Sequence, residues 1–246
     1  MPRGTRGYDA AQRNTADGRA YRGWEERLLQ AIRFLLSGVC HQLSAHSYWA
    51  GGQPLPLCAR CSGTFLGIWV GLLTLRWMGH HRRTGMPSGP AAWVLGALAA
   101  LWALDGANSF LADALGRPLY PPTNLLRLIS GAGMGVALSA VVAPMCALAF
   151  AHDDKRPVAR SAHDVLALLA GAGSVVVVVG LGAGLSPILW ALALGAATVG
   201  AVALLNALLV RLAVARWPRW AVWGAGVLLA LGEMGAIAGL RGLIGI

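Results

Sequence analysis

The sequence predicts an all-α fold, a polytopic integral membrane bundle of about six or seven transmembrane helices. Of its 246 residues, 57% are hydrophobic and 12% are charged, whereas soluble domains carry about 25% charged residues. No charged residue lies between Val165 and Val210, a run long enough for two crossings of about 20 residues each. A bilayer admits only helices or closed barrels as spanning structures, and the runs of Ala, Leu and Gly lack the alternation of barrel strands.

The first 27 residues differ from the rest. They are polar and rich in Gly and Arg, and we expect residues 1–27 to form a disordered cytoplasmic tail. The segment lacks the apolar core of a secretory signal peptide. The apolar segment Leu28–Val39 that follows is too short to cross a bilayer by itself at about 1.5 Å per residue. It must therefore extend, recruit its neighbours or lie at the interface.

Longer apolar runs predict six full spans. A Gly-rich stretch ending in Ser186 and Pro187 divides the long uncharged run, because glycines permit a tight turn and Ser-Pro opens a helix. We divide the chain into the tail, a membrane core over 28–150 that carries the polar motifs, and an additional three-span module over 151–246. The spans lie near Leu57–Met78, Ala91–Ala112, Leu125–Ala151, Val165–Leu185, Pro187–Val210 and Trp220–Leu240.

Basic residues alternate between the connecting loops. The loops Arg76–Pro90, His152–His163 and Arg211–Arg219 each hold three Lys or Arg residues, and the loops between them are poor in both. Basic loops stay on the cytoplasmic side, so this alternation predicts a cytoplasmic N-terminus. It also accounts for the net charge of +10 without nucleic acid as a partner. A cytoplasmic aromatic belt is expected from Trp77, Trp93, Trp217 and Trp220.

With this orientation, unusual polar residues gather at the outer ends of the first three full spans. Ionisable groups at such depth are costly and face a partner or an aqueous cavity. Two i,i+3 pairs share helix faces, one of Asp105 with Asn108 and one of Asn124 with Arg127. The polar residues at these ends include Cys40, His41, Cys58, Arg60, Cys61, Asp105, Asn108, Ser109, Thr123, Asn124 and Arg127.

The cysteines predict a metal site. Cys58 and Cys61 form a Cys-x-x-Cys pair, which lets two thiolates bind one ion from a single turn, and Cys40 with His41 lies 17 residues earlier. Three sulfurs and one nitrogen suit zinc, and soft thiolates also suit copper(I). His46 is a substitute for His41 as the fourth ligand. The predicted ligands are therefore Cys40, His41, Cys58 and Cys61, with zinc or copper as the cofactor.

Two other interpretations of the same cysteines remain open. In an oxidising periplasm, two of them form a structural disulfide and leave the third free. Alternatively they are a redox pair, because Arg60 and a helix N-terminus both favour a thiolate.

The Asp, Asn and Arg residues beside the cysteines predict a polar pocket. If the metal is catalytic, Asp105 is the candidate general acid or base, and Arg60, Arg127 and Asn124 hold a polar or anionic substrate. The competing interpretation is structural. An ion pair of Asp105 with Arg60 or Arg127 then pins two helices together.

In combination, these motifs resemble a family of uncharacterised prokaryotic polytopic membrane proteins, classed as a domain of unknown function. The resemblance covers roughly residues 36–135 and implies a multi-pass protein of the prokaryotic cytoplasmic (inner) membrane, with no established reaction. His46 stands where a basic Arg is expected, and Ser109 stands where a Gln is usual. The matching residues are Cys40, His41, Gln42, Ser47, Cys58, Arg60, Cys61, Gly63, Asp105, Gly106, Thr123, Asn124, Arg127 and Gly131.

The sequence thus predicts an outward-facing Cys/His metal site beside a polar pocket, with the lipid bilayer as partner. One alternative is a transporter of a metal or anion, in which the intramembrane Glu233 couples protons or pairs with Arg241. Another is a non-catalytic subunit that contacts partner subunits and carries a structural disulfide.

Overall fold

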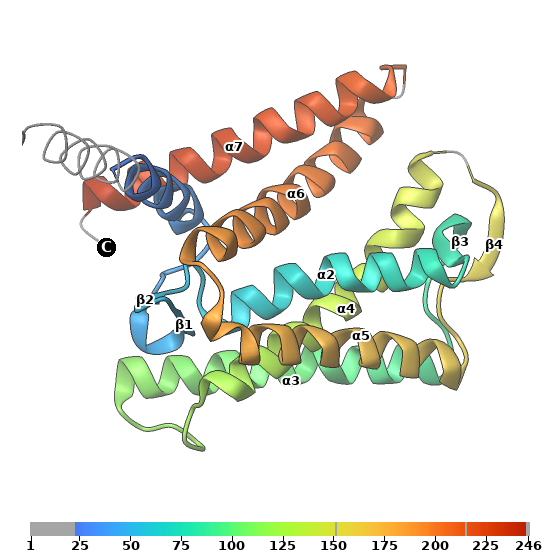
Figure 1. The fold of residues 1–246 in the computed structure, drawn as a ribbon. Helices are drawn as coiled ribbons and strands as arrows, with labels where there is room; N and C mark the ends of the chain where they lie inside the picture. The colour runs from blue at the N-terminus through green and yellow to red at the C-terminus, as the bar shows by residue number, and fades with distance from the viewer. Residues whose placement is uncertain (1–22, 151, 215, 245–246) are drawn as a thin grey trace, which may run out of the picture.

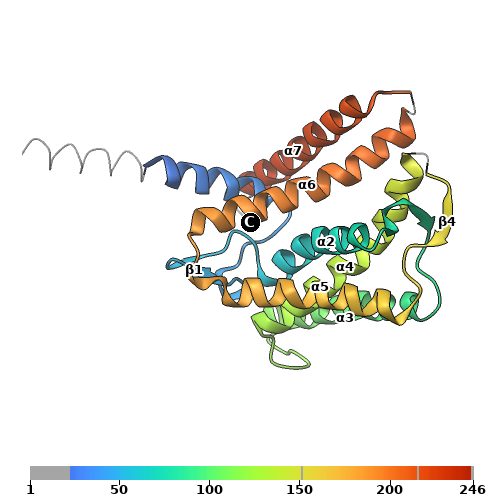
Figure 2. The same cartoon turned by 45° about the vertical axis from the view of Figure 1, so that its right-hand side comes forward.

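The computed structural model describes residues 23–150, 152–214 and 216–244, so most of the predicted tail lies outside the described residues. The described chain is a helical bundle, which confirms the predicted fold class (Figures 1 and 2). Residues 23–37 are helical and precede two short strands, β1 (Trp49–Ala50) and β2 (Gln53–Pro54). The long helices are α2 (Ala59–Trp77), α3 (Pro90–Leu115), α4 (Asn124–Ala149), α5 (Ala162–Leu181), α6 (Pro187–Ala213) and α7 (Arg219–Ile244).

Five of these helices, α3 to α7, are long and apolar enough to cross a membrane. Helix α2 has 19 residues, with Arg60 near its start and Arg76 in its last turn, and is not one of the five. It lies inside the bundle, packed against α4, α5 and α6. The predicted boundaries agree with the observed helices to within a few residues, because Pro90 and Pro187 open helices and a short 3-10 turn, Gly182–Gly184, separates α5 from α6.

Helices α2 and α4 approach each other at backbone contact distance. A Cβ atom added to Gly131 would lie 2.2 Å from the carbonyl oxygen of Arg60, and one added to Gly135 would lie 2.4 Å from that of Thr64. Small residues permit such close packing between membrane helices. This approach fixes the start of α2, and therefore Arg60, against α4.

The basic loops meet at one end of the molecule. Strand β3 (Arg83–Gly85) pairs in parallel with β4 (Asp154–Pro157), which joins the first two basic loops. The third loop reaches the same end, because Arg211 Nε donates to the carbonyl oxygen of Ala149 at 3.2 Å. All four tryptophans predicted for the aromatic belt are exposed near the helix ends on this side, namely Trp77, Trp93, Trp217 and Trp220.

The opposite end carries the segment between residues 38 and 58. The β1–β2 hairpin lies beside the α5–α6 turn, where a Cβ atom on Gly51 would contact Pro187 at 2.7 Å. Figure 1 shows this hairpin and the β3–β4 pair at opposite ends of the bundle. The loops rich in Lys and Arg therefore lie at one end of the bundle, and the segment that carries the cysteines lies at the other.

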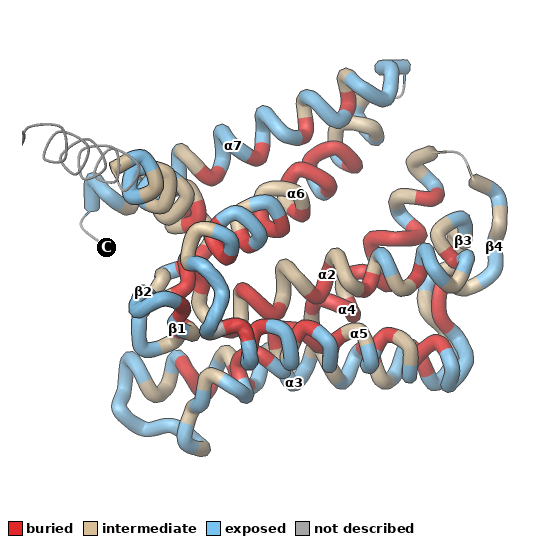
Figure 3. Tube along the Cα trace, in the orientation of Figure 1, coloured by how far each residue is buried: buried red, intermediate tan, exposed pale blue. Residues whose placement is uncertain are grey.

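The main apolar core extends across residue 150, the predicted boundary of the C-terminal module. Leu168 and Val175 of α5 belong to the same buried cluster as Leu128 and Val136 of α4. Helices α6 and α7 form a hairpin that leans away from α2 and α4, and much of the outer surface of α7 is exposed (Figure 3). Packing thus places α5 with the core, and the division into modules stays a prediction.

Candidate metal and polar site

Three thiols converge at the polar end of the bundle. Cys40 follows the helical segment 23–37, Cys58 is the N-cap residue of α2, and Cys61 lies in the first turn of that helix. Their sulfur atoms all lie within 4.8 Å of one another. Within the described ranges, this is the one group of three or more His, Cys, Asp or Glu side chains placed closely enough to share an ion.

Backbone amides point at two of the three sulfurs. Cys40 Sγ accepts from the N–H of Cys58 at 3.3 Å and from the N–H of Gln42 at 3.4 Å. Cys58 Sγ accepts from the N–H of Cys61 at 3.5 Å. The Gln42 contact depends on a backbone φ of 54°, which non-glycine residues adopt rarely and which occurs most often at functional sites. These amides favour negative charge on the sulfurs.

Contacts among the thiols also influence their protonation. The hydrogen bond with Cys58, together with burial, raises the pKa of Cys40 to about 11. Cys40 is therefore a neutral thiol at pH 7 when nothing is bound, and a metal ion would displace its proton.

His41 lines the same cavity as the three cysteines, but its ring contacts an arginine of the last helix. Its ring accepts from Arg241 Nη2, which lies 2.9 Å from Nδ1 and 3.3 Å from Nε2. Arg241 also donates to the carbonyl oxygens of Ser37 and Cys40. His41 thus connects the cysteine loop to the last helix, and its ring is not part of the close three-sulfur group.

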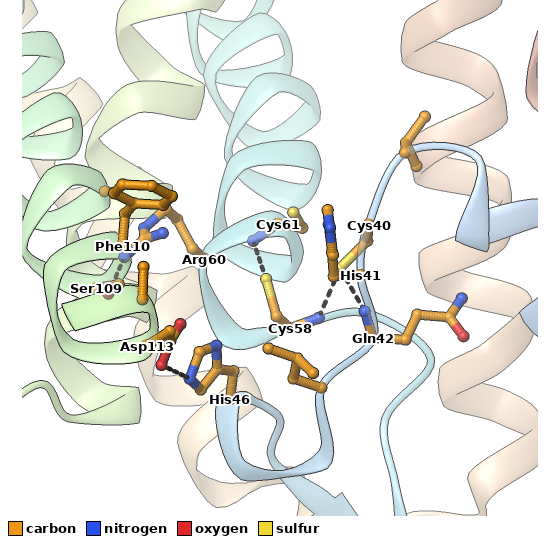
Figure 4. A pocket seen from close by; sticks show the side chains of 14 residues that line it. Cys40, His41, Gln42, His46, Cys58, Arg60, Cys61, Ser109, Phe110 and Asp113 are labelled. Carbon is orange, nitrogen blue, oxygen red and sulfur yellow. Dashed lines mark hydrogen bonds and ion pairs between the residues drawn. The ribbon is translucent and has the colours of Figure 1, made fainter. Parts of the chain in front are cut away.

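His46 lies on the other side of the cysteines, in the 3-10 turn Ser44–His46. Its Nε2 is 3.3 Å from Oδ1 of Asp113, which lies in the last turn of α3. In Figure 4, His46 lies between Asp113 and Cys58. The sequence interpretation missed Asp113, although its spacing from Asp105 and Ser109 is the i,i+4 repeat of one helix face.

Arg60 joins α2 to α3. Its Nε and Nη2 donate to Asp105 Oδ2 at 3.0 and 2.5 Å, and its Nη2 also donates to Ser109 Oγ at 2.7 Å. The predicted ion pair between Asp105 and an arginine is therefore confirmed as a contact. Figure 4 shows the guanidinium extended toward Ser109.

The Asp105 carboxylate is saturated by other donors as well. Tyr120 donates to Oδ1 at 3.0 Å, and Ser130 donates to Oδ2 at 3.2 Å. Burial, followed by the hydrogen bond to Asp105, raises the pKa of Tyr120, so its hydroxyl remains a donor. Asn108 holds the same loop through the backbone of Leu119 and Tyr120. Asp105 is thus a buried, fully paired carboxylate.

Arg127 continues this network into the cysteine loop. Its Nε donates to Ser109 at 3.3 Å, and its Nη1 donates to Asn124 Oδ1 at 3.0 Å. Asn124 Nδ2 then donates to the carbonyl oxygens of Ala45 and Ser47, at 3.2 and 3.3 Å. The predicted face shared by Asn124 and Arg127 therefore supports the turn that carries His46.

An open cavity of about 510 Å³ connects these groups. The structure brings all the predicted site residues to one end of the bundle, but not all of them line the cavity. Three lie behind its wall and support it, namely Asp105, Asn124 and Arg127. The polar side chains that line it are Cys40, His41, Gln42, His46, Cys58, Arg60, Cys61, Ser109 and Asp113.

Glu233 is remote from this network. Its Oε2 accepts from Asn206 Nδ2 at 3.1 Å, within the α6–α7 hairpin. Its predicted partner, Arg241, contacts the cysteine loop instead.

Among known proteins, a match was found for the N-terminal part of the membrane region only. Residues 40–141 match the model of a family described as "Predicted membrane protein (DUF2085)". This match confirms the resemblance predicted from the motifs, and it covers the cysteine loop and most of α2 to α4. No curated protein and no solved structure matches the chain significantly.

Proposed function

We propose that this membrane protein binds a metal ion through the thiolates of Cys40, Cys58 and Cys61, at the outer face of a prokaryotic cytoplasmic membrane. Zinc is the first candidate, because three sulfurs and one further ligand are a common tetrahedral set for that ion. Copper(I) is the second, because it also prefers soft thiolates.

The observation that carries the proposal is the convergence of the three sulfurs. Cys40 comes from one segment, and Cys58 and Cys61 come from another, with the β1–β2 hairpin between them. Their mutual separation, within 4.8 Å, is compatible with ligation of a single ion at metal–sulfur distances of about 2.3 Å. The amides that point at two of the sulfurs supply the outer contacts that tune such sites.

The Asp105 contacts support a positioning role for that carboxylate. Both oxygens already accept hydrogen bonds, from Arg60, Tyr120 and Ser130. A general base needs a free lone pair directed at the substrate. Asp105 therefore fits the structural ion pair better than the general acid or base of a catalytic centre.

The test is metal analysis of the full-length protein, purified in detergent without added metal. We expect about one ion per chain, and we expect the double variant Cys58→Ser/Cys61→Ser to lose it. Cys146→Ser is the matched control, because Cys146 lies on α4 outside the thiol group. Absence of bound metal, together with an intact mass two hydrogen atoms lighter than that of the reduced chain, would establish a disulfide in its place.

A further inference from the structure

We infer that His46, oriented by Asp113 and supported by Asn124, is the histidine that completes the metal site, and that it binds through Nδ1. This inference rests on the proposed function, because it assigns the fourth ligand of the same three-thiolate centre. It replaces His41, the histidine adjacent to Cys40 in the sequence, with one that the tertiary structure selects.

The two imidazole rings, of His46 and His41, differ in what their nitrogen lone pairs face. A neutral imidazole has one N–H donor and one nitrogen lone pair. His46 Nε2 faces the Asp113 carboxylate at 3.3 Å, and a carboxylate accepts hydrogen bonds. The proton of His46 therefore belongs on Nε2, which leaves the lone pair on Nδ1 for a metal ion. Carboxylate–histidine–metal chains of this kind are common in zinc proteins.

His41 has the opposite arrangement. Its contact is a guanidinium, which donates and never accepts, so the lone pair of the ring is directed at Arg241. To bind an ion, His41 would have to give up that hydrogen bond and place the metal beside a fixed positive charge. Arg241 is itself held by the carbonyl oxygens of Ser37 and Cys40, so it cannot readily move away.

Hydrogen bonds from α4 also support the turn that carries His46. Asn124 donates to the carbonyl oxygens of Ala45 and Ser47, the two residues that flank His46. Arg127 fixes the amide of Asn124, and Ser109 fixes Arg127. The hydrogen bonds from Ser109 through Arg127 and Asn124 thus hold the backbone on both sides of His46.

Metal binding also requires the His46 ring to move toward the sulfurs. His46 lines the same cavity as Cys58 and Cys61, but it is not part of the group within 4.8 Å. Asn124 holds the backbone of this turn, and the His46 side chain, which is 17% exposed, lies in the cavity wall, so the movement is one of the ring and not of the turn.

Cobalt(II) bound to the full-length protein in detergent tests this assignment. Thiolate-to-cobalt absorption reports the sulfur ligands, and the visible bands report the whole four-ligand set. We expect His46→Gln to weaken cobalt binding at least 10-fold and to change the visible bands while the sulfur absorption persists. Asp113→Asn is expected to weaken binding by about 10- to 100-fold, the usual effect of losing a partner that orients a metal-binding histidine. His41→Gln is the matched control and should resemble the wild type in both spectrum and affinity.

The outcomes separate the two proposals. If His46→Gln binds like the wild type, or if His41→Gln shows the loss expected for His46, the assignment of His46 is wrong while three-thiolate binding stands. If the wild-type protein binds none of cobalt(II), zinc and copper(I), the proposed function itself fails. Thermal unfolding of each metal-free variant shows whether it remains folded, so a weakened site is distinguishable from a damaged one.

Discussion

Buried polar side chains around the thiols are paired mainly with one another and with loop backbone. Arg60 and Arg127 share Ser109, and Asp105 collects donors from three elements of the structure. These contacts give a structural role to residues of the motifs on which the family resemblance depends. Asp105 positions Arg60 at the start of α2, and Asn124 holds the turn before Ser47.

At this scale we predict that Asp105→Asn destabilises the protein by about 3–5 kcal/mol, because it leaves the Arg60 guanidinium without its buried counter-ion. Thermal unfolding in detergent, followed by tryptophan fluorescence, would measure the loss. Asp153→Asn is the control, because Asp153 is exposed in a loop. Equal melting temperatures for the two variants would show that the ion pair contributes little.

Among the elements, the α2–α4 contact determines where the site forms. Gly63, Gly67 and Gly71 of α2 face small residues of α4 at contact distances that exclude a Cβ atom. Because the two backbones touch here, the first turn of α2 is fixed against α4. Cys61 and Arg60 both lie in that turn, so helix packing positions a thiol and the ion pair together.

We predict opposite effects for two glycine-to-alanine substitutions. Gly135→Ala places a Cβ atom 2.4 Å from the carbonyl oxygen of Thr64, and such overpacking costs about 1–3 kcal/mol. Gly96→Ala on α3 meets nothing within 4 Å and removes a flexible residue from a helix, so it should stabilise by about 0.5–1 kcal/mol. The unfolding midpoint should fall for Gly135→Ala and rise for Gly96→Ala, relative to the wild type. A neutral Gly135→Ala would contradict the close approach.

For the whole molecule, the arrangement of charge is asymmetric. The three basic loops meet at one end with the exposed tryptophans, and the thiols lie toward the other. The contacts show that the basic loops share an end. The positive-inside rule supplies the prediction that this end is cytoplasmic.

Labelling of whole cells tests that orientation. Arg117→Cys adds a thiol to the α3–α4 loop, and Lys155→Cys adds one to β4; both positions are exposed. A membrane-impermeant maleimide should modify Arg117→Cys in intact cells and Lys155→Cys only after permeabilisation, with the modified peptides identified by mass spectrometry. The reverse pattern would place the thiol group on the cytoplasmic side.

The sequence by itself determined the class of fold, the helix boundaries and the identity of the polar end. These follow from local properties: run length, proline and glycine positions, and the distribution of Lys and Arg. The Cys-x-x-Cys spacing and the i,i+3 pair of Asn124 with Arg127 are also local, because one helix fixes them.

Only the tertiary structure decided which groups face one another. The partner of Asp105 comes from another helix, and the His41 ring contacts Arg241, 200 residues away. The role of Asp113 likewise depends on a turn that Asn124 holds from α4. Helix periodicity places a side chain on a face, but it leaves open which neighbour that face meets. Packing of α2 against α4, with the polar contacts that follow from it, supplies the answer.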